Sequence, residues 1–375
     1  MLGSLDGKES RVLLHAHAGA LYASGHILFL QQNTLMAQPF DTKRMELSGD
    51  AFAIADSVQE EETSMRSLFS VSQNGMLAYL EGASFAKREL LWMDRSGKKG
   101  TAVPGTDLYA NARISPDGKR LAYVTHLPIF DIWIYDIPRG VKTRLTFGAG
   151  TGQANLNPVW SPNGQRVAYL SLRNGKYGIY QKSADGSGSE ELLIEGSDLE
   201  YPNDWSPNGK FLAFQQSVQG SFAAWILPLS GERKPYPFQF KPDSFASAFS
   251  PDGKWLAYCS TASGERQVYV EPFPGPGGKW QVSPASGCYP RWRRDQKELF
   301  YLSTDNKMMA SEVKANGSSF VIGAVTPLFE AQLYRIVTGA YDVSADGQRF
   351  LVISNPGQPD ASITLVQNWD VELKK

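Results

Sequence analysis

The sequence predicts an all-β protein, a β-propeller of four-stranded antiparallel blades. One turn motif, Ser-Pro-Asp-Gly or Ser-Pro-Asn-Gly followed by an apolar strand, occurs four times along the chain. The glycines of these turns, Gly118, Gly164, Gly209 and Gly253, are 46, 45 and 44 residues apart. Since one propeller blade takes about 40–50 residues, each motif marks one blade.

The motif has the chemistry of a hairpin turn between two strands. In Ser115–Val124, which reads SPDGKRLAYV, Pro116 presets φ at a corner and Gly118 supplies the positive φ that reverses the chain. The following residues are apolar on both faces, which is typical of a strand packed between neighbouring sheets. Near-copies stand at 161–170, 206–215 and 250–259, with a looser copy at 344–353.

Weaker markers extend the array in both directions. Upstream, turns at Gly75 and Gly25 precede apolar strands, and downstream Gln296 and Gly347 do the same. The markers therefore lie near residues 25, 75, 118, 164, 209, 253, 296 and 347. They predict a single domain over residues 1–375 with eight blades, seven being the alternative.

Each unit continues with two more strands after the hairpin. Third strands are predicted at 131–136, 177–181, 224–228 and 267–271, and fourth strands at 143–147 and 279–282. No segment has the period of a convincing amphipathic helix, so the unit is a four-stranded meander.

The two ends must pair if the propeller is to close without a bare strand edge. The last unit has strands near 341–344, 349–353 and 363–369, and then lacks a fourth. We therefore expect an N-terminal strand, residues 11–15, to complete the C-terminal blade. Residues 1–9 and 370–375 are expected to be frayed.

The composition excludes several classes of function. The chain has 37 Lys and Arg against 38 Asp and Glu, a net charge of −1, so no field favours nucleic acid. No apolar run reaches the roughly 20 residues of a membrane helix, and the N-terminus lacks the pattern of a secretion signal. Cys259 and Cys288 have no metal-site spacing and are expected to be two buried thiols. We expect a monomer.

The sequence offers no convincing catalytic, cofactor or metal site. His15 and His17 resemble half of a metal site, but no further ligand stands at a suitable spacing, so a solvated pair is the preferred interpretation. No Gly-x-Ser-x-Gly motif is present, and the glycine-rich segments 148–152 and 275–279 lack the context of phosphate-binding loops. Asp131 and Asp136 lie at opposite ends of one predicted strand, too far apart for joint catalysis.

The segment Arg291-Trp292-Arg293-Arg294 is the one concentrated basic cluster. An aromatic ring among arginines can stack on bases or bind phosphate. Trp292, however, stands where Trp160 and Trp205 precede other turns, so the simpler interpretation is a core tryptophan flanked by turn arginines.

The best candidates for binding are the residues that enter each first strand, because propellers bind ligands at a mouth of the central channel. These residues are amides and aromatics, which suit an unidentified protein, peptide or glycan. With one arginine of the basic cluster, the candidates are Tyr109, Asn111, Asn155, Asn157, Tyr201, Asn203, Phe245, Tyr289 and Arg291.

Longer strings resemble one family. Thr34–Asp41, Tyr201–Pro207, Glu271–Val282, Pro290–Asp295 and Tyr341–Phe350 are similar to TolB-type, WD-like propeller repeats, and more specifically to the C-terminal propeller of bacterial, especially acidobacterial, transmembrane serine/threonine kinases. The resemblance implies an extracytoplasmic or periplasmic location and further blades upstream. The chain departs from those kinases because it has no HRD-type loop, no DFG and no glycine-rich nucleotide loop.

The sequence therefore predicts a non-catalytic sensor or interaction module. The alternative is the accessory propeller, or lid, of a prolyl-oligopeptidase-type hydrolase. Such an enzyme needs a catalytic α/β domain with a Ser nucleophile, and that domain is absent from this sequence.

Overall fold

The computed structural model describes residues 2–3, 10–14, 16, 19–31, 33–61, 66–72, 74–81, 87–125, 130–148, 154–196, 199–218, 220–317, 319–330, 333, 341–354 and 362–370. Among them the regular structure is entirely β, as predicted, and no helix is long and apolar enough to cross a membrane. The chain divides into two compact units, residues 1–86 with 357–375 and residues 87–356, which we describe separately.

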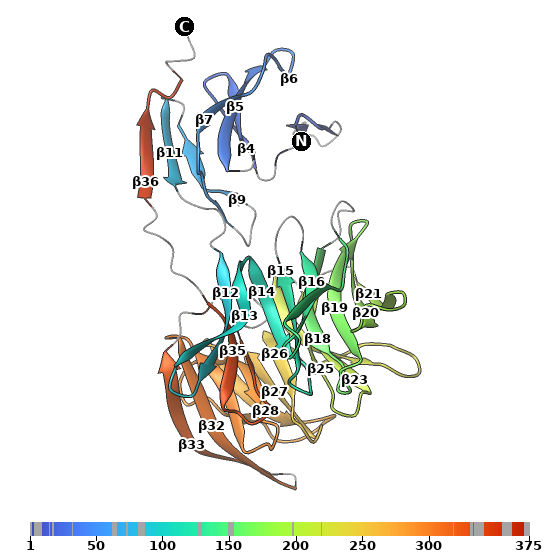
Figure 1. Ribbon diagram of the computed structural model, residues 1–375. Coiled ribbons are helices and arrows are strands. Elements are labelled where there is room, and N and C mark those ends of the chain that lie inside the picture. Colours follow the sequence, from blue (N-terminus) through green and yellow to red (C-terminus); the bar gives the residue numbers. More distant parts are fainter. Residues whose placement is uncertain are drawn as a thin grey trace. The chain divides into compact units, whose positions relative to one another are not determined.

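The second unit consists of six four-stranded antiparallel sheets (Figure 1). Each sheet is given from its innermost strand outward. The first two sheets are β14 (Tyr109–Ile114), β15 (Arg120–Thr125), β16 (Asp131–Asp136) and β17 (Val141–Arg144), and then β18 (Ala154–Trp160), β19 (Arg166–Arg173), β20 (Lys176–Ser183) and β21 (Glu191–Gly196); the third and fourth are β22 (Glu200–Trp205), β23 (Phe211–Val218), β24 (Ser221–Pro228) and β25 (Tyr236–Pro242), and then β26 (Ser244–Phe249), β27 (Trp255–Ser260), β28 (Gln267–Pro272) and β29 (Trp280–Gln281). The fifth is β30 (Gly287–Trp292), β31 (Glu298–Ser303), β32 (Lys307–Asn316) and β33 (Ser319–Glu330), and the sixth is β34 (Tyr341–Val343), β35 (Arg349–Ile353), β12 (Arg88–Asp94) and β13 (Lys99–Asp107).

The last of these sheets joins the two ends of the unit. β35 pairs with β12, and Leu91 lies opposite Val352. The expectation that an N-terminal strand, residues 11–15, completes the C-terminal blade is wrong, because β12 pairs with β35. Arg11 pairs with Leu2 instead, and His15 lies outside the described residues. The segment predicted as the third strand of this blade also pairs elsewhere, because β36 (Ser362–Gln367) lies beside β11 (Met76–Glu81).

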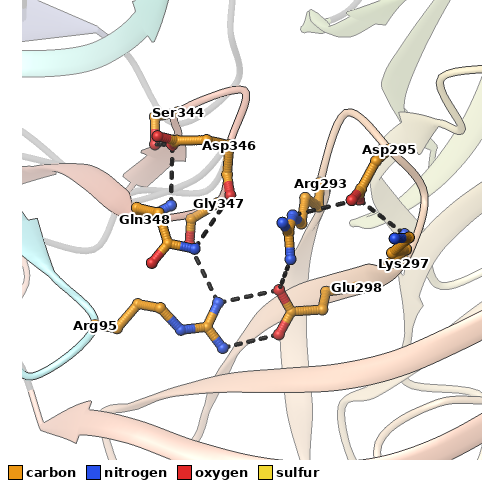
Figure 2. A network of polar contacts seen from close by, with 9 residues as sticks. All are labelled: Arg95, Arg293, Asp295, Lys297, Glu298, Ser344, Asp346, Gly347 and Gln348. Atoms are coloured by element: carbon orange, nitrogen blue, oxygen red, sulfur yellow. Dashed lines mark hydrogen bonds and ion pairs between the residues drawn. The ribbon is translucent and has the colours of Figure 1, made fainter.

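Side chains fasten the same closure (Figure 2). Arg95, in the turn between β12 and β13, donates to both carboxylate oxygens of Glu298, at 2.8 and 3.0 Å. It also donates to the carbonyl of Gly347, at 3.2 Å, in the turn before β35. Arg293 donates to Glu298 at 2.9 Å, so one carboxylate links the last two sheets.

The core of this unit lies between neighbouring sheets. Val124 of β15 packs in one cluster with Trp160 and Val167 of the next sheet. The rings of Phe300 and Phe350, on the second strands of the last two sheets, have centroids 5.1 Å apart. All six residues of β27 are buried, so this strand packs on both faces, as predicted for the strand after the turn.

The two cysteines form a disulfide, so the prediction of two separate thiols is wrong. Cys259 of β27 and Cys288 of β30 belong to neighbouring sheets, and their Cα atoms are 5.0 Å apart. Both are buried, as predicted. Their distance in sequence, 29 residues, gives no sign of pairing because only blade stacking brings them together.

Five of the six innermost strands contain a bulge before their last residues. The register of β14, β18, β22, β26 and β30 against the second strand shifts near the middle of each strand. Four bulge residues have positive φ although they are not glycine, namely Asn111, Asn157, Ala246 and Tyr289. A bulge turns the following side chains, so it decides which of them face the axis of the ring.

The first unit holds two larger sheets. One consists of β3 (Leu21–Ala23), β4 (His26–Gln31), β5 (Thr34–Asp41), β6 (Glu46–Leu47) and β7 (Phe52–Ala55), and the other of β10 (Phe69–Val71), β11 and β36. Two short pairs are β1 (Leu2–Gly3) with β2 (Ser10–Arg11) and β8 (Glu60–Glu61) with β9 (Arg66–Ser67).

The eight predicted markers each lie in a sheet of their own, two in the first unit and six in the second. At the termini, which were expected to be frayed, Leu2–Gly3 pairs with β2 and Asp370 is buried. Residues 4–9 and 371–375 lie outside the described part.

Candidate functional site

A recess of about 670 Å³ opens where the six innermost strands of the second unit run into their hairpin turns. Every blade contributes the same three positions to its wall. Two residues before the turn serine, or its equivalent, stand Arg113, Val159, Asp204, Ala248, Arg291 and Asp342, which we call the inner ring. One residue before it stand Ile114, Trp160, Trp205, Phe249, Trp292 and Val343, and one after it Pro116, Pro162, Pro207, Pro251, Arg294 and Ala345.

The turns hold these positions through one repeated set of hydrogen bonds. Ser115 Oγ donates to Asp117 Oδ1 at 2.5 Å and accepts from the backbone N–H of Arg120 at 2.9 Å. The N–H of Gly118, at φ 70°, donates to the carbonyl of Ser115 at 2.8 Å. The turns that begin at Ser161, Ser206, Ser250 and Ser344 repeat the pattern. The hydrogen bonds of the Ser-Pro-Asp/Asn-Gly turns therefore fix the backbone around the recess.

Two inner-ring carboxylates hold neighbouring blades in register. Asp342 Oδ2 accepts the N–H of Ile114 at 2.8 Å, and Asp204 Oδ2 accepts the N–H of Phe249 at 2.7 Å. In both cases the donor lies in the innermost strand of the next blade, one residue before its turn serine. The two aspartates thus perform the same structural task in opposite blades of the ring.

The inner ring divides its charges unevenly. Arg113 and Arg291 lie on the two blades that flank Asp342, and Arg291 Nε is 3.7 Å from Asp342 Oδ1. Arg113 donates to the carbonyl of Tyr341 at 3.3 Å. Asp204, on the opposite blade, has Val159 and Ala248 as its neighbours in the ring. One side therefore carries two positive charges and one negative charge, and the other side a single carboxylate.

Burial shifts the pKa values of two inner-ring groups. It raises the pKa of Asp204 to about 6, although the charges of Arg291 and Arg113 and two backbone hydrogen bonds act against the rise. Burial and then the charge of Arg291 lower the pKa of Arg113 to about 10, so this guanidinium remains protonated at neutral pH. Asp204 is the group whose charge changes in the physiological range.

Aromatic side chains line the recess above the inner ring. The indole N–H of Trp160 donates to the carbonyl of Arg113 at 3.2 Å, and that of Trp292 to the carbonyl of Ala248 at 3.1 Å. Each tryptophan is thus tied to the preceding blade, which fixes its ring. The expectation that Trp292 is a core residue is confirmed, since it is 8% exposed.

Most of the predicted site residues lie before or in the bulges of the innermost strands, away from the turns. Only Asn203 and Arg291 of the predicted set line the recess. Tyr109 and Asn155 are each 1% exposed, and Asn155 donates to Asp131 at 3.1 Å. The carbonyl of Tyr289 accepts the hydroxyl of Tyr341 at 2.8 Å. Several members therefore hold blades together, and a binding role for the set stays a prediction.

Sequence reasoning missed Arg113, Asp204 and Asp342 as a group. Counting back two residues from each turn serine would have aligned them with Arg291. The bulge lies between these positions and the predicted candidates, so it shifts the register between the candidates and the turn.

Other sequence candidates have structural partners. Asp131 accepts from Thr146 Oγ1 at 2.7 Å and from the N–H of Gly148 at 2.9 Å, while Asp136 accepts from the N–H of Arg139 at 3.0 Å. Both aspartates make strand-end hydrogen bonds, as expected. Within the described residues no group of three or more His, Cys, Asp or Glu side chains could hold a metal ion, and His15 and His17 lie outside them.

The repeat geometry agrees with a family comparison. Residues 61–236 match the family model of the TolB β-propeller domain, PD40. This segment is similar to TolB-type propeller repeats. A solved structure of a candidate TolB from Agrobacterium tumefaciens covers 72% of this chain and 98% of its own, with a TM-score of 0.58 and 18% identity. At that identity the likeness concerns the fold alone.

Three curated relatives match shorter parts of the chain. The chain is 39% identical over 95 residues to an uncharacterized protein of Agrobacterium fabrum, 36% over 76 residues to the Tol-Pal system protein TolB of Gluconobacter oxydans, and 30% over 112 residues to an uncharacterized peptidase of Bacillus subtilis. These alignments take in 25%, 20% and 28% of this chain. They span 30%, 16% and 16% of the relatives, less than a third of each.

Proposed function

We propose that this chain is a non-catalytic, TolB-like binding module that takes a peptide segment, or a loop of a protein partner, into the recess. The observation that carries the proposal is that all six blades of the second unit deliver the same three positions to one cavity. A volume of about 670 Å³ suits a few residues of an extended peptide. Fixed aromatic walls and buried charges at its base supply packing and orientation.

The test is selection from a displayed library of random dodecapeptides against the purified chain. Ala345→Trp places a bulky side chain at the exposed rim of the recess and should abolish capture. Ala262→Trp adds the same bulk to an exposed turn outside the recess and should leave capture unchanged. Failure to select any peptide, or equal capture by Ala345→Trp, would contradict the proposal.

A second candidate is the accessory propeller of a prolyl-oligopeptidase-type hydrolase. The match to the uncharacterized peptidase over 112 residues favours it. In that case the recess would receive a peptide on its way to a catalytic domain encoded with the propeller. Sequencing the native gene on both sides of this segment separates the two, since an α/β domain with a Ser nucleophile in frame would support the hydrolase.

We further propose that the module works outside the cytoplasm. The disulfide between Cys259 and Cys288 supports this, because disulfides persist mainly in oxidising compartments. The finer proposal, that the propeller is the sensor part of a receptor kinase, rests on the resemblance of its repeat strings. A kinase domain and a membrane helix in frame upstream of Met1 would support it. An unmodified thiol pair in cells, found by alkylation and mass spectrometry, would contradict the location.

A further inference from the structure

Asp204 is an inner-ring carboxylate without an ion pair. Among the described residues no basic nitrogen lies within 4.0 Å of it, whereas Arg291 approaches Asp342 to 3.7 Å. Its two oxygens each accept one backbone N–H, from Trp205 at 2.9 Å and from Phe249 at 2.7 Å. These bonds fix the carboxylate group. A carboxylate has about four acceptor sites, so capacity for a ligand remains.

The surroundings of Asp204 leave room for an incoming group. Its two inner-ring neighbours, Val159 and Ala248, are the two small apolar members of the ring. On the opposite side the ring positions are filled by the long side chains of Arg113 and Arg291. Small apolar side chains therefore flank Asp204 in the inner ring, whereas long basic side chains flank Asp342.

The aromatic rings of the recess differ in whether a cation of the chain lies over them. Arg120 lies over the ring of Trp160 and Arg349 over that of Trp92, both at 4.8 Å from the centroid. In the described part of the chain no Lys or Arg lies over Trp205, the residue that follows Asp204. The indole of Trp205 therefore has no cation of the chain stacked on it.

We propose that Asp204, with Trp205, forms a subsite for a cationic group of the bound peptide. The group is the guanidinium or ammonium of an Arg or Lys side chain, or the free amine of a peptide N-terminus. The carboxylate accepts charge-assisted hydrogen bonds from it, and the indole of Trp205 attracts it through its π electrons. This inference rests on the proposed function and adds the chemical class of the ligand.

The environment of the carboxylate agrees with this role. Burial raises the pKa of Asp204 to about 6, which means that the charges of Arg113 and Arg291 do not compensate the desolvation of the ionised form. The other carboxylate of the inner ring, Asp342, is engaged by Arg291 and by the N–H of Ile114. A ligand cation beside Asp204 supplies the missing compensation. The affinity of the recess for the cationic ligand should fall as the pH drops below about 6, because Asp204 is then protonated.

The experiment selects the dodecapeptide library in parallel on the wild type and on Asp204→Asn. Peptides that Ala345→Trp excludes should be enriched in Arg and Lys on the wild type and not on Asp204→Asn. A synthetic peptide from the wild-type pool should lose about tenfold or more in affinity for Asp204→Asn, because a desolvated charged hydrogen bond contributes about 1.5–3 kcal/mol. Acetylating its N-terminus, or replacing its basic residue by Gln, then identifies which cation binds.

Asp117→Asn is the matched control. It removes a carboxylate from the rim of the same recess, at a position where other turns carry Asn163 and Asn208. It should change affinity less than twofold. Peptides that bind in the recess without basic enrichment, or equally well to Asp204→Asn, would overturn the cationic subsite and leave the proposed function standing. No recess-dependent peptide at all would overturn both.

Discussion

Arg95 and Glu298 are 203 residues apart in sequence and form a two-bond ion pair between the last two blades of the second unit. Arg95 lies in the β12–β13 turn, in the sheet that joins the two ends of the unit, and Glu298 begins β31. Arg293 holds the same carboxylate at 2.9 Å (Figure 2). One glutamate thus lies between two guanidiniums at the point where the ring closes.

We predict that Glu298→Gln destabilises the protein more than Arg95→Lys. The first change leaves two guanidiniums facing each other in a site where the Glu298 side chain is 12% exposed, and should cost about 2 kcal/mol. Arg95→Lys keeps the positive charge but loses the bidentate hydrogen bonding to the carboxylate, and should lower the unfolding free energy by about 1 kcal/mol. Urea unfolding measures both. Equal losses, or none for Glu298→Gln, would mean that the pair does not fasten the closure.

The fold was predictable because the residues of each Ser-Pro-Asp/Asn-Gly turn by themselves indicate a hairpin turn between two strands. The spacing of about 45 residues between these turns then predicts one four-stranded blade for each turn, and no knowledge of contacts between distant residues is needed. Closure was not predictable in detail, because β35 needs a partner strand and the sequence offers several upstream. Pairing with β12 is decided by packing, such as Leu91 opposite Val352, and by ion pairs such as Arg95 with Glu298.

The recess was harder to predict than the fold. Asn111 and Tyr289 looked like mouth residues because amides and aromatics often bind ligands, but their positive φ marks them as bulge residues. The residues that do face the recess, Asp204 and Asp342 among them, lie after the bulge. Side chains alternate between the two faces of a regular strand, but a bulge interrupts this alternation. Which side chains face the recess could therefore be read only from the structure.

We predict opposite pH effects for the two carboxylates Asp204 and Glu298. The folded-state pKa of Asp204 is raised from 3.8 to about 6, so its ionisation costs stability as pH rises through that window. For Glu298, burial acts to raise the pKa, but hydrogen bonds from Arg95 and Arg293 outweigh it and lower the pKa. Its contribution is therefore present above its unfolded-state value of 4.5 and is lost on acidification.

The measurement is the unfolding free energy of wild type, Asp204→Asn and Glu298→Gln across pH 4 to 8. Relative to Asp204→Asn, the wild type should lose about 2 kcal/mol as the pH rises from about 4.5 to 7.5. Relative to Glu298→Gln, it should gain stability as the pH rises through about 4. A difference from Asp204→Asn that is flat with pH would show that Asp204 does not titrate in this range.

We predict that the disulfide between Cys259 and Cys288 stabilises the second unit. It closes a loop of about 29 residues across two blades, which corresponds to about 3 kcal/mol in the chain-entropy model. Reduction, or the double change Cys259→Ala with Cys288→Ala, should lower the melting temperature by several degrees. Thiol titration of the unreduced, denatured protein should detect no free thiol. Two thiols per chain would contradict the pairing.

We predict that Ala246, in the bulge of β26, tolerates replacement by glycine but not by a β-branched residue. It has φ 53°, is 2% exposed, and its N–H donates to Gln215 Oε1 at 3.0 Å. Ala246→Gly relieves the left-handed conformation and offsets the greater freedom of glycine in the unfolded chain, so it should change stability by less than about 0.5 kcal/mol. Ala246→Val should cost about 2 kcal/mol, because a β-branched side chain resists positive φ.

Ala122 of β15 provides the matched control for this prediction. It is fully buried, like Ala246, but stands in a regular strand between Leu121 and Tyr123. Ala122→Gly should therefore cost about 1 kcal/mol, where Ala246→Gly costs almost nothing. Thermal and urea unfolding of the two glycine variants give the comparison directly. Equal losses would mean that the bulge in β26 is not strained and that the orientation of Ala248, which follows it, has another cause.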